Sequence, residues 1–419
     1  MNIDELRREL QRFSQDHLLF GWSSLSENQR EALVSQLREM DFELLAGLHA
    51  QSAGELDPLA WIPRSAPPPA IRLSSSPPVT KTDLAARACG EELLRRGQLA
   101  VLMVAGGQGT RLGLSLPKGL LPVGPISGRT LFQIHADRIR AVERAYATRL
   151  PWLIMTSEAT HQPTLDYLAR ENFLGLDPSQ FHVFCQGTMP AVDAVSGKVL
   201  LEAPGRIALS PDGHGGTLAA LVRAGLLDRL TTEGVEHVFY FQVDNPLVDI
   251  ADPTFLGRHV LAESEMTTQV VAKRDALERV GNVVAVDGQL RIVEYSDLPE
   301  SLAEARNPDG SLRIWAGNIA VHAFAVPFLT RMSRDPDALP FHRAFKLVPC
   351  LDPAGRPHQP SSPNAIKFER FIFDILPYAR HALVVEVDPA EAFAPVKNAA
   401  GAETDTLASA QAAMMAQHR

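Results

Sequence analysis

The chain is poor in cysteine and has no long apolar run. Only three cysteines, Cys89, Cys185 and Cys350, occur in 419 residues, and they lie far apart. An odd number at such spacings forms neither a disulfide framework nor a metal-binding pattern, so we expect a reducing, cytoplasmic environment. No uninterrupted apolar run reaches the roughly 18 residues that a membrane-spanning helix needs, so we expect no membrane partner.

Positive charge is also in deficit. The chain has 40 Lys and Arg residues against 49 Asp and Glu residues, which gives a formal net charge of −9. This balance argues against a general binder of nucleic acids or membrane surfaces. Any anionic ligand must therefore be held by a local cluster of cations. The Gly-x-Ser-x-Gly pattern of serine hydrolases is absent as well.

The order of the hydrophobic segments predicts an α/β fold. Runs of strand length alternate with helical patterns, which is typical of a Rossmann-like, mostly parallel or mixed sheet with helices on both faces. Expected strands are 99–105, 152–156, 181–185, 237–243, 268–272, 281–286, 291–294, 318–324 and 382–387, and expected helices between them are 130–146, 161–171, 216–230 and 365–376.

Flanking segments complete the expected domain organisation. Residues 1–96 read as an N-terminal helical region that includes a proline-rich connector at 62–79. Residues 97–400 form the expected catalytic domain, and 401–419 form a short C-terminal helix or tail. A chain of this length can bury a large core and fits two or three domains.

A glycine loop follows the first expected strand. It reads Ala105-Gly106-Gly107-Gln108-Gly109-Thr110-Arg111-Leu112-Gly113, with Pro117-Lys118-Gly119 shortly after it. The third glycine of a dinucleotide fingerprint is replaced by Leu112, and Lys118 lacks the Ser or Thr of a Walker loop. The remaining pattern offers backbone N–H donors and two cations, Arg111 and Lys118, to a polyphosphate. The alternative is an ordinary tight turn with solvated cations.

Asp244 directly follows an expected strand and places its carboxylate at the carboxyl end of that strand. Open α/β sheets bind ligands at the carboxyl ends of their strands, and Mg²⁺ takes one or two carboxylates together with phosphate oxygens. Asp244 is therefore the expected Mg²⁺ ligand. The alternative is an aspartate that only forms the turn before Asn245-Pro246.

Taken with the glycine loop, a series of ordered motifs resembles the UDP-sugar pyrophosphorylase family, most of all its UDP-N-acetylglucosamine pyrophosphorylases. The motifs are Gln186-Gly187-Thr188-Met189-Pro190-Ala191, Ser210-Pro211-Asp212-Gly213-His214-Gly215-Gly216, Val243-Asp244-Asn245-Pro246-Leu247, Val293-Glu294-Tyr295-Ser296, Ala316-Gly317-Asn318-Ile319, Asn364-Ala365-Ile366-Lys367-Phe368-Glu369 and Ala394-Pro395-Val396-Lys397-Asn398. The resemblance implies a nucleotide-diphospho-sugar transferase fold with an N-terminal helical portion.

The same resemblance implies a reaction and its partners. UTP and N-acetylglucosamine 1-phosphate would yield UDP-N-acetylglucosamine and pyrophosphate by in-line attack, with Mg²⁺ and without a covalent intermediate. The attacking phosphate has a second pKa near about 6, so it needs no general base. Arg111 and Lys118 suit the leaving pyrophosphate. Lys397 is expected at the sugar phosphate, and Lys367 is expected to reach the phosphates from the start of a helix.

The resemblance also assigns substrate contacts. Gln186, Gly106, Gly107 and Gly213 are implied at the uracil, whose imide edge needs both a donor and an acceptor. The residues implied near the sugar or its acetamido group are Gly281, Glu294 and Asn318. A capped loop amide is the alternative for Gln186. For Glu294 the alternative is a cross-strand salt bridge with Arg291 or Lys273.

Two departures from the family pattern leave alternatives open. His214 stands where eukaryotic members carry Asn and UDP-glucose enzymes carry His, so glucose 1-phosphate or a broader sugar range is the second candidate substrate. The alternative for His214 is a plain loop histidine without a ligand contact. Only 22 residues follow Lys397, so we expect the family's C-terminal domain to be missing and the chain to be monomeric. A nucleotide-sugar-binding regulator and a dinucleotide oxidoreductase are less favoured functions.

Overall fold

The computed structural model of the chain describes residues 3–50, 60–73, 80–113, 116–335 and 338–417, and its elements fall into two units. The first unit takes its described residues from Met1–Pro58, Gly187–Gly216 and Leu339–Phe371, and the second from Leu59–Gln186, Thr217–Ala338 and Ile372–Arg419. These units cut across the expected ranges 1–96, 97–400 and 401–419. The difference arises because two later segments pack with the N-terminal helices, which local sequence patterns do not reveal.

A nine-stranded mixed sheet organises the second unit, and all nine expected strands are present in it. The strand order is β12-β11-β13-β9-β1-β2-β3, while β10 pairs with β13 and β18. The strands are β1 (Leu99–Val104), β2 (Trp152–Thr156), β3 (Phe181–Cys185), β9 (His237–Gln242), β10 (Met266–Ala272), β11 (Gly281–Val286), β12 (Gln289–Val293), β13 (Ala316–Ala325) and β18 (Leu383–Glu386).

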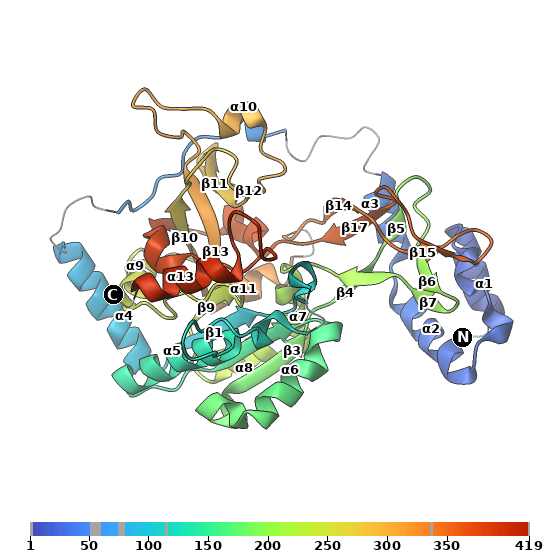
Figure 1. Cartoon of the computed structure of the whole chain (residues 1–419), viewed down its shortest axis with the longest axis horizontal. Coiled ribbons are helices and arrows are strands. Elements are labelled where there is room, and N and C mark those ends of the chain that lie inside the picture. Colours follow the sequence, from blue (N-terminus) through green and yellow to red (C-terminus); the bar gives the residue numbers. More distant parts are fainter. Residues whose placement is uncertain (1–2, 51–59, 74–79, 114–115, 336–337, 418–419) are drawn as a thin grey trace. The chain divides into compact units, whose positions relative to one another are not determined.

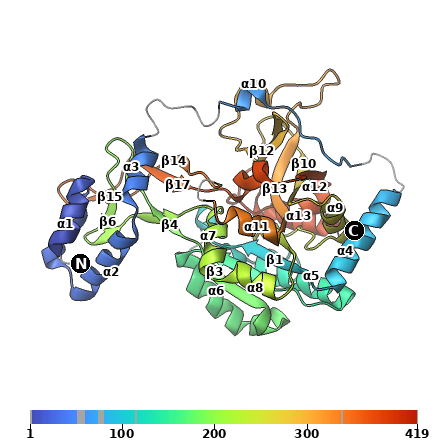
Figure 2. The same ribbon diagram turned by 180° about the vertical axis from the view of Figure 1, so that it is seen from behind.

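Parallel pairing brings several loops to one edge of this sheet. Strands β9, β1, β2 and β3 are neighbours and run parallel, and Figures 1 and 2 show β1 and β3 in this part of the sheet. The carboxyl ends of parallel neighbours lie at the same edge. The loops that follow β1, β2, β3 and β9 therefore gather there, which is where the sequence places Gly106, Lys118, Gln186 and Asp244.

Helices cover the sheet of the second unit. They are α4 (Lys81–Arg95), α5 (Leu131–Tyr146), α6 (Glu158–Arg170), α7 (Gly216–Arg223), α8 (Leu226–Thr232), α9 (Pro253–Leu261), α10 (Glu300–Ala303), α11 (Val326–Met332), α12 (Pro389–Ala392) and α13 (Leu407–Gln417). One apolar cluster joins β1 and β9 to α4, α5, α9 and α13. On another side of β2, the Thr217 hydroxyl of α7 donates to the Met155 sulfur. The expected helix 216–230 is divided at Gly225, whose φ is +65°.

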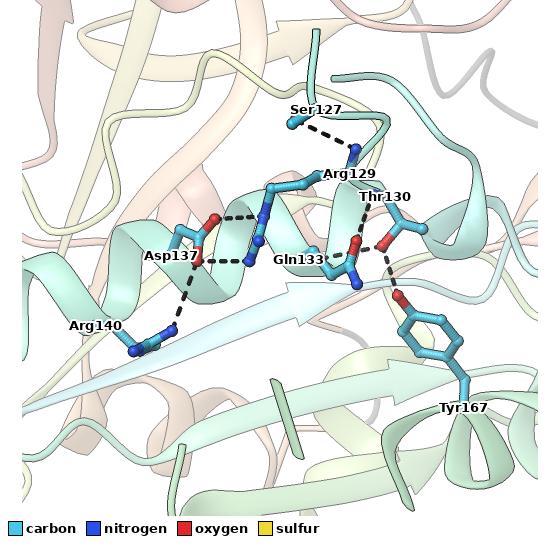
Figure 3. Close-up of polar contacts among 7 residues, drawn as sticks. All are labelled: Ser127, Arg129, Thr130, Gln133, Asp137, Arg140 and Tyr167. Atoms are coloured by element: carbon cyan, nitrogen blue, oxygen red, sulfur yellow. Dashed lines mark hydrogen bonds and ion pairs between the residues drawn. The ribbon is translucent and has the colours of Figure 1, made fainter. Parts of the chain in front are cut away.

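The start of α5 is fixed by its own side chains (Figure 3). The Thr130 amide donates to Gln133 Oε1 at 3.0 Å, and the Gln133 amide donates to Thr130 Oγ1 at 3.2 Å. This reciprocal capping satisfies two amides that a helix end otherwise leaves unpaired. Thr130 Oγ1 also lies 2.8 Å from the Tyr167 hydroxyl of α6, and Arg129 forms an ion pair with Asp137. Helix α5 therefore begins at a defined position, which matters because it carries His135.

The first unit combines helices with short strands. Its helices are α1 (Ile3–Arg12), α2 (Glu27–Glu39) and α3 (Phe42–Ala50), and its strands are β4 (Thr188–Pro190), β5 (Val192–Asp193), β6 (Leu201–Ala203), β7 (Arg206–Ile207), β8 (Leu209–Pro211), β14 (His342–Lys346), β15 (Cys350–Leu351), β16 (Pro357–His358) and β17 (Ala365–Glu369). Strands β14, β17 and β5 form an antiparallel sheet. Leu6, Leu10 and Leu33 share a buried cluster with Ile366 and Phe368 of β17.

One expected helix is wrong. Residues 365–376 form strand β17 followed by a 3-10 helix, Ile372–Tyr378. Ile366 and Phe368 are fully buried while Lys367 between them is half-buried, which is the two-residue alternation of a strand. A short apolar run does not distinguish the two states by itself. Lys367 therefore lies on a strand and not at the start of a helix.

None of the described helices combines the length and the apolar character that a membrane crossing requires. The remaining short elements of the second unit are 3-10 helices at Ile62–Arg64, Thr110–Leu112, Lys118–Leu120, Asn172–Gly175 and Pro178–Gln180. Two of these, Thr110–Leu112 and Lys118–Leu120, belong to the glycine loop. Part of the proline-rich connector, residues 74–79, lies outside the described residues.

Candidate functional site

The glycine loop after β1 folds back on itself. The Lys118 amide donates to the Gly107 carbonyl at 3.1 Å, and the Gly109 amide donates to Leu116 O at 3.3 Å. Gly113 has a φ of +73°, which favours glycine at the turn. A side chain at Gly107 would meet no atom within 4 Å. The Gly107 backbone is thus open to a ligand, and the fold of the loop brings Lys118 back beside it.

Lys118 forms an ion pair with Asp244. Its Nζ atom lies 3.1 Å from Asp244 Oδ2, and the two side chains are only 17% and 11% exposed. Burial alone would raise the pKa of the Asp244 carboxyl, but the charges of Lys118 and Lys397 lower it below its usual value. The carboxylate is therefore ionised at neutral pH and available to a cation. Lys118 and Asp244, which the sequence analysis assigned to one site, are thus in direct contact.

Lys397 belongs to the same cluster of charges. The Val396 amide donates to the Asp244 carbonyl at 2.9 Å, which joins the segment before Lys397 to the end of β9. The Lys397 ammonium lies 5.4 Å from the centre of the Phe393 ring. Two lysines thus act electrostatically on one buried carboxylate. Within a site this arrangement can bind phosphate oxygens and a divalent cation at once.

Arg111 is on the loop but not in this cluster. It lies in the 3-10 turn Thr110–Leu112, its side chain is exposed, and it makes no ion pair or hydrogen bond with the described residues. Its role at the leaving group therefore stays a prediction.

Gln186 and Gly106, both assigned to the uracil by the resemblance, are neighbours in the structure. The backbone N–H of Gln186 donates to Thr156 O at 2.8 Å, and the Gln186 side chain is buried. A Cβ atom at Gly106 would lie 3.0 Å from Gln186 Oε1. The Ser157 hydroxyl donates to Gly106 O at 2.7 Å and holds the loop in this position. The glycine therefore lets the Gln186 amide approach the loop backbone.

Gly281, Glu294 and Asn318 converge on one face of the sheet. Gly281 is the register partner of Asn318, and a Cβ atom at Gly281 would lie 3.4 Å from Glu294 Oε1. The two cations considered as partners of Glu294 contact other groups. Lys273 donates to Ala276 O at 3.3 Å, and Arg291 lies over the Trp61 ring. The two polar side chains, Glu294 and Asn318, lie on either side of Gly281 and are close enough to share one small ligand.

Gly213, His214 and Lys367 belong to the first unit, where Gly213 needs its positive φ of +83°. A Cβ atom there would overlap the Arg370 backbone. The His214 ring stacks on Phe371 with centroids 5.2 Å apart. Burial, with the neighbouring His342 adding to it, lowers the pKa of His214 to about 4, so the ring is neutral at pH 7. Its contact with a substrate stays a prediction, as do those of Gly213 and Lys367.

The sequence analysis missed His135 and Asn245. The His135 Nε2 atom of α5 lies 2.9 Å from the Val243 carbonyl, directly before Asp244, and its ring is fully buried against Phe241. Burial lowers the pKa of His135 to about 4. No metal spacing or motif marked this histidine. Asn245 stood inside a quoted motif, and its place next to Asp244 was the available signal.

Asp244 is the expected metal ligand of the site, and the Asp405 carboxyl also lies near enough to interact electrostatically with Asp244 and Lys397. Among the described residues, no group of three or more His, Cys, Asp or Glu side chains is placed to hold an ion. Asp244 is buried, ionised and adjacent to two lysines, so a cation there would need phosphate oxygens as its other ligands.

Comparison with known proteins gives consistent matches. A family model described as "UTP--glucose-1-phosphate uridylyltransferase" matches residues 71–415. A human protein described as "UDP-N-acetylhexosamine pyrophosphorylase-like protein 1" is 39% identical over 432 residues, which cover 99% of this chain and 84% of that relative. The UDP-N-acetylglucosamine pyrophosphorylase of Saccharomyces cerevisiae is 34% identical over 407 residues, which cover 93% of this chain and 85% of that relative.

Solved structures agree in fold. The uridine diphosphate N-acetylglucosamine pyrophosphorylase from Trypanosoma brucei matches with a TM-score of 0.83 and 28% identity, covering 99% of this chain and 84% of that chain. UDP-glucose phosphorylase from the same organism matches with a TM-score of 0.66 and 20% identity, covering 91% of this chain and 75% of that chain. At that identity the second match speaks only for the fold. The mixed α/β sheet expected from the sequence is confirmed.

Proposed function

Because the chain belongs to the UTP–glucose-1-phosphate uridylyltransferase family, we propose that it makes UDP-N-acetylglucosamine and pyrophosphate from UTP and N-acetylglucosamine 1-phosphate. The relatives whose descriptions name UDP-N-acetylglucosamine support the choice of sugar. The observation that carries the proposal is the buried arrangement of Lys118, Asp244 and Lys397 beside the open glycine loop.

The site residues divide the work by charge and position. Backbone amides of the glycine loop and Lys118 bind the phosphates of UTP, and Lys397 binds the phosphate of the sugar. A sugar phosphate oxygen attacks the α-phosphorus of UTP, and the bond from that phosphorus to the bridging oxygen breaks. Lys118 and Arg111 then stabilise the charge that develops on the departing pyrophosphate. No proton has to be removed, because the attacking phosphate is already ionised at neutral pH.

Asp244 is suited to serve as a Mg²⁺ ligand. The carboxylate is buried, ionised and next to the expected phosphate positions, which is the donor set that Mg²⁺ uses with nucleotides. A bound Mg²⁺ would neutralise phosphate charge and orient the triphosphate. The Lys118 ammonium lies 3.1 Å from the same carboxylate.

Uracil and sugar recognition are assigned to the two polar groups of the second unit. Gln186 presents an amide donor and acceptor next to Gly106, which suits the imide edge of uracil. Glu294 and Asn318 bind sugar hydroxyls or the acetamido group beside Gly281. Buried polar groups of this kind discriminate strongly, since a missing partner leaves them unpaired.

A pyrophosphate-release assay tests the proposed function. The purified chain is given UTP, Mg²⁺ and a panel of sugar 1-phosphates, and we expect the highest kcat/KM with N-acetylglucosamine 1-phosphate. The exposed Lys198 provides a control, because Lys198→Gln removes one positive charge at a residue that is not assigned to the site. No pyrophosphate with any sugar phosphate would refute the proposal.

Glucose 1-phosphate is the second candidate substrate, favoured by His214. The ring is neutral and stacked on Phe371, so it can serve as a hydrogen-bonding neighbour but not as a cation. We expect His214→Asn to shift the ratio of the two kcat/KM values toward the N-acetylated sugar. The ratio is measured with both sugar phosphates on one enzyme preparation. An unchanged ratio would remove His214 from sugar selection.

Location and assembly complete the proposal. Three cysteines without a disulfide are consistent with a cytoplasmic protein, which cell fractionation tests. A monomer is the proposed assembly, and light scattering should then return the chain mass of 45.7 kDa.

A further inference from the structure

Asn245 makes three hydrogen bonds to the backbone although it follows directly on Asp244. Its side-chain Nδ2 donates to the Ala392 carbonyl at 2.7 Å. Its Oδ1 accepts from the Ala394 amide at 3.1 Å and from the Leu247 amide at 3.2 Å. The residue is 3% exposed. A single buried amide therefore connects the turn after β9 to a segment almost 150 residues further along the chain.

That segment leads directly to Lys397. After Ala392 and Ala394, the Val396 amide donates to the Asp244 carbonyl at 2.9 Å. The Lys397 and Asn398 amides then donate to one carbonyl, that of Asp405, at 2.7 and 2.9 Å. The backbone before Lys397 is thus tied to Asp244 and Asn245, and the backbone at Lys397 is tied to the residues before α13.

The chemistry of this position suits asparagine in particular. Two backbone amides need an acceptor and one carbonyl needs a donor, and a short side-chain amide provides both. Aspartate would lose the donor and add a second buried negative charge beside Asp244. Alanine would leave three backbone groups without their partner, each of which is costly to bury unpaired.

We propose that Asn245 is a positioning residue that fixes Lys397 relative to the Asp244 carboxylate. It touches no reacting atom and acts through residues 392–397. The inference rests on the proposed function, in which Asp244 serves the nucleotide phosphates and Lys397 serves the sugar phosphate. With the two groups held as one piece, the attacking oxygen approaches the α-phosphorus from a set direction. A displacement of about 1 Å in such a site can reduce the rate by roughly 100-fold.

A double-mutant cycle tests the coupling to Lys397. We expect Asn245→Ala to reduce kcat/KM for the sugar phosphate by roughly 100-fold while UTP affinity, measured by calorimetry, changes less than about three-fold. If Asn245 acts through Lys397, the pair Asn245→Ala and Lys397→Ala loses scarcely more activity than Lys397→Ala alone. If the fold-losses of Asn245→Ala and Lys397→Ala multiply in the double variant, the inference is overturned. The control is the double variant of Asn245→Ala and Arg111→Ala, in which the two fold-losses should multiply.

Hydrogen exchange provides a readout that does not depend on activity. Asn245→Ala should increase amide exchange in a peptide covering 392–398 by roughly ten-fold or more, while a peptide from β18 stays unchanged. The control Asn307→Ala removes a local bond to Ser311 and should leave both peptides unchanged. Unchanged exchange at 392–398 would overturn the inference.

Two precautions keep the experiment decisive. If Asn245→Ala does not fold, Asn245→Ser is measured in its place. Its hydroxyl is still a hydrogen-bond acceptor, but on a shorter side chain. If the wild-type chain releases no pyrophosphate with any sugar phosphate, the proposed function fails. Increased exchange at 392–398 would then still support the positioning of Lys397, so the two failures are distinguishable.

Discussion

At the scale of single residues, the ion pair between Lys118 and Asp244 sets the charge of the site before a ligand binds. The two side chains are mostly buried, and the pair is separated by 3.1 Å. Burying the Asp244 carboxylate without a cation would cost free energy, because its charge would be uncompensated. With both charges present, Lys118 can pair with a phosphate and Asp244 with a metal ion. The pair therefore keeps Asp244 ionised for a cation.

Replacing Lys118 tests its part in catalysis. We expect Lys118→Gln to reduce kcat by roughly 100- to 1,000-fold, because the variant lacks a fixed positive charge where the leaving pyrophosphate becomes more negative. Steady-state kinetics with varied UTP give kcat and KM separately, and Lys198→Gln serves as the matched control. A rise in KM for UTP with kcat unchanged would limit Lys118 to ground-state binding.

Buried histidines make the stability of the second unit depend on pH. Burial lowers the pKa of His135 to about 4 and that of His259 to about 3, against 6.5 for an exposed histidine. Between about pH 6.5 and 4 the unfolded chain binds more protons than the folded chain. The free energy of unfolding therefore falls as the pH falls through this range and is unaffected by these groups above it.

The variant His135→Gln isolates one of these contributions. Glutamine can still donate to Val243 O but does not titrate, so stability should fall less steeply, by roughly 2 kcal/mol between pH 7 and 5. Urea unfolding at a series of pH values measures the difference. An identical pH dependence in wild type and variant would show that His135 does not remain neutral in the folded chain.

At the scale of elements, helices α4 and α9 cross at two glycines. A Cβ atom at Gly90 of α4 would overlap the Pro253 backbone, and one at Gly257 of α9 would overlap the Ala86 carbonyl. The backbones can approach this closely only because both side chains are hydrogen atoms. The crossing places α9 against β9 through Phe255, which stacks edge-on to Phe239.

A single added methyl group tests this crossing. We expect Gly257→Ala to lower the free energy of unfolding by about 1–3 kcal/mol, because the helices must separate or the backbone must shift. Gly47 of α3 is the control, since a Cβ atom there meets nothing within 4 Å. Gly47→Ala should be neutral or stabilise by up to about 1 kcal/mol. Equal effects in thermal unfolding would contradict the close crossing.

At the scale of the whole molecule, the first unit is assembled from three separate parts of the chain. Helices α1, α2 and α3 supply Leu6, Leu33 and Leu45 to a cluster completed by Val192 and Ile366 from later segments. No single cut in the chain releases this unit. Its N-terminal helices are thus part of one core with residues that sequence analysis assigned to another domain.

Deleting residues 1–58 tests whether the N-terminal helices share a core with later segments, as the structure shows, or belong to a separate range, as the sequence analysis assigned them. The structure predicts that segments 187–216 and 339–371 become sensitive to proteases, because their apolar residues lose the helices that bury them. Limited proteolysis with mass spectrometry locates the new cleavage sites, and the full chain is the reference. Equal resistance in both proteins would contradict a core shared between the N-terminal helices and these two segments.

Local patterns were sufficient for much of the fold and for part of the site. The nine strands of the large sheet are rich in apolar runs bounded by turn residues, and a carboxylate after such a run marks the ligand edge of the sheet. Asp244 was assigned in this way and Lys118 from the glycine loop, whereas Gly106 and Gln186 were assigned by the family resemblance. Residues 365–369 were misread as helical because a short apolar run has no clear period.

What the sequence determined by itself was the class of fold, the family and the kinds of groups in the site, since these depend on residue types and their order. Only the tertiary structure decided that Asn245 holds the segment before Lys397 and that His135 holds the strand before Asp244. Both contacts join residues more than 100 positions apart. Such pairings follow from packing and from the need to satisfy buried backbone groups, and no local pattern encodes them.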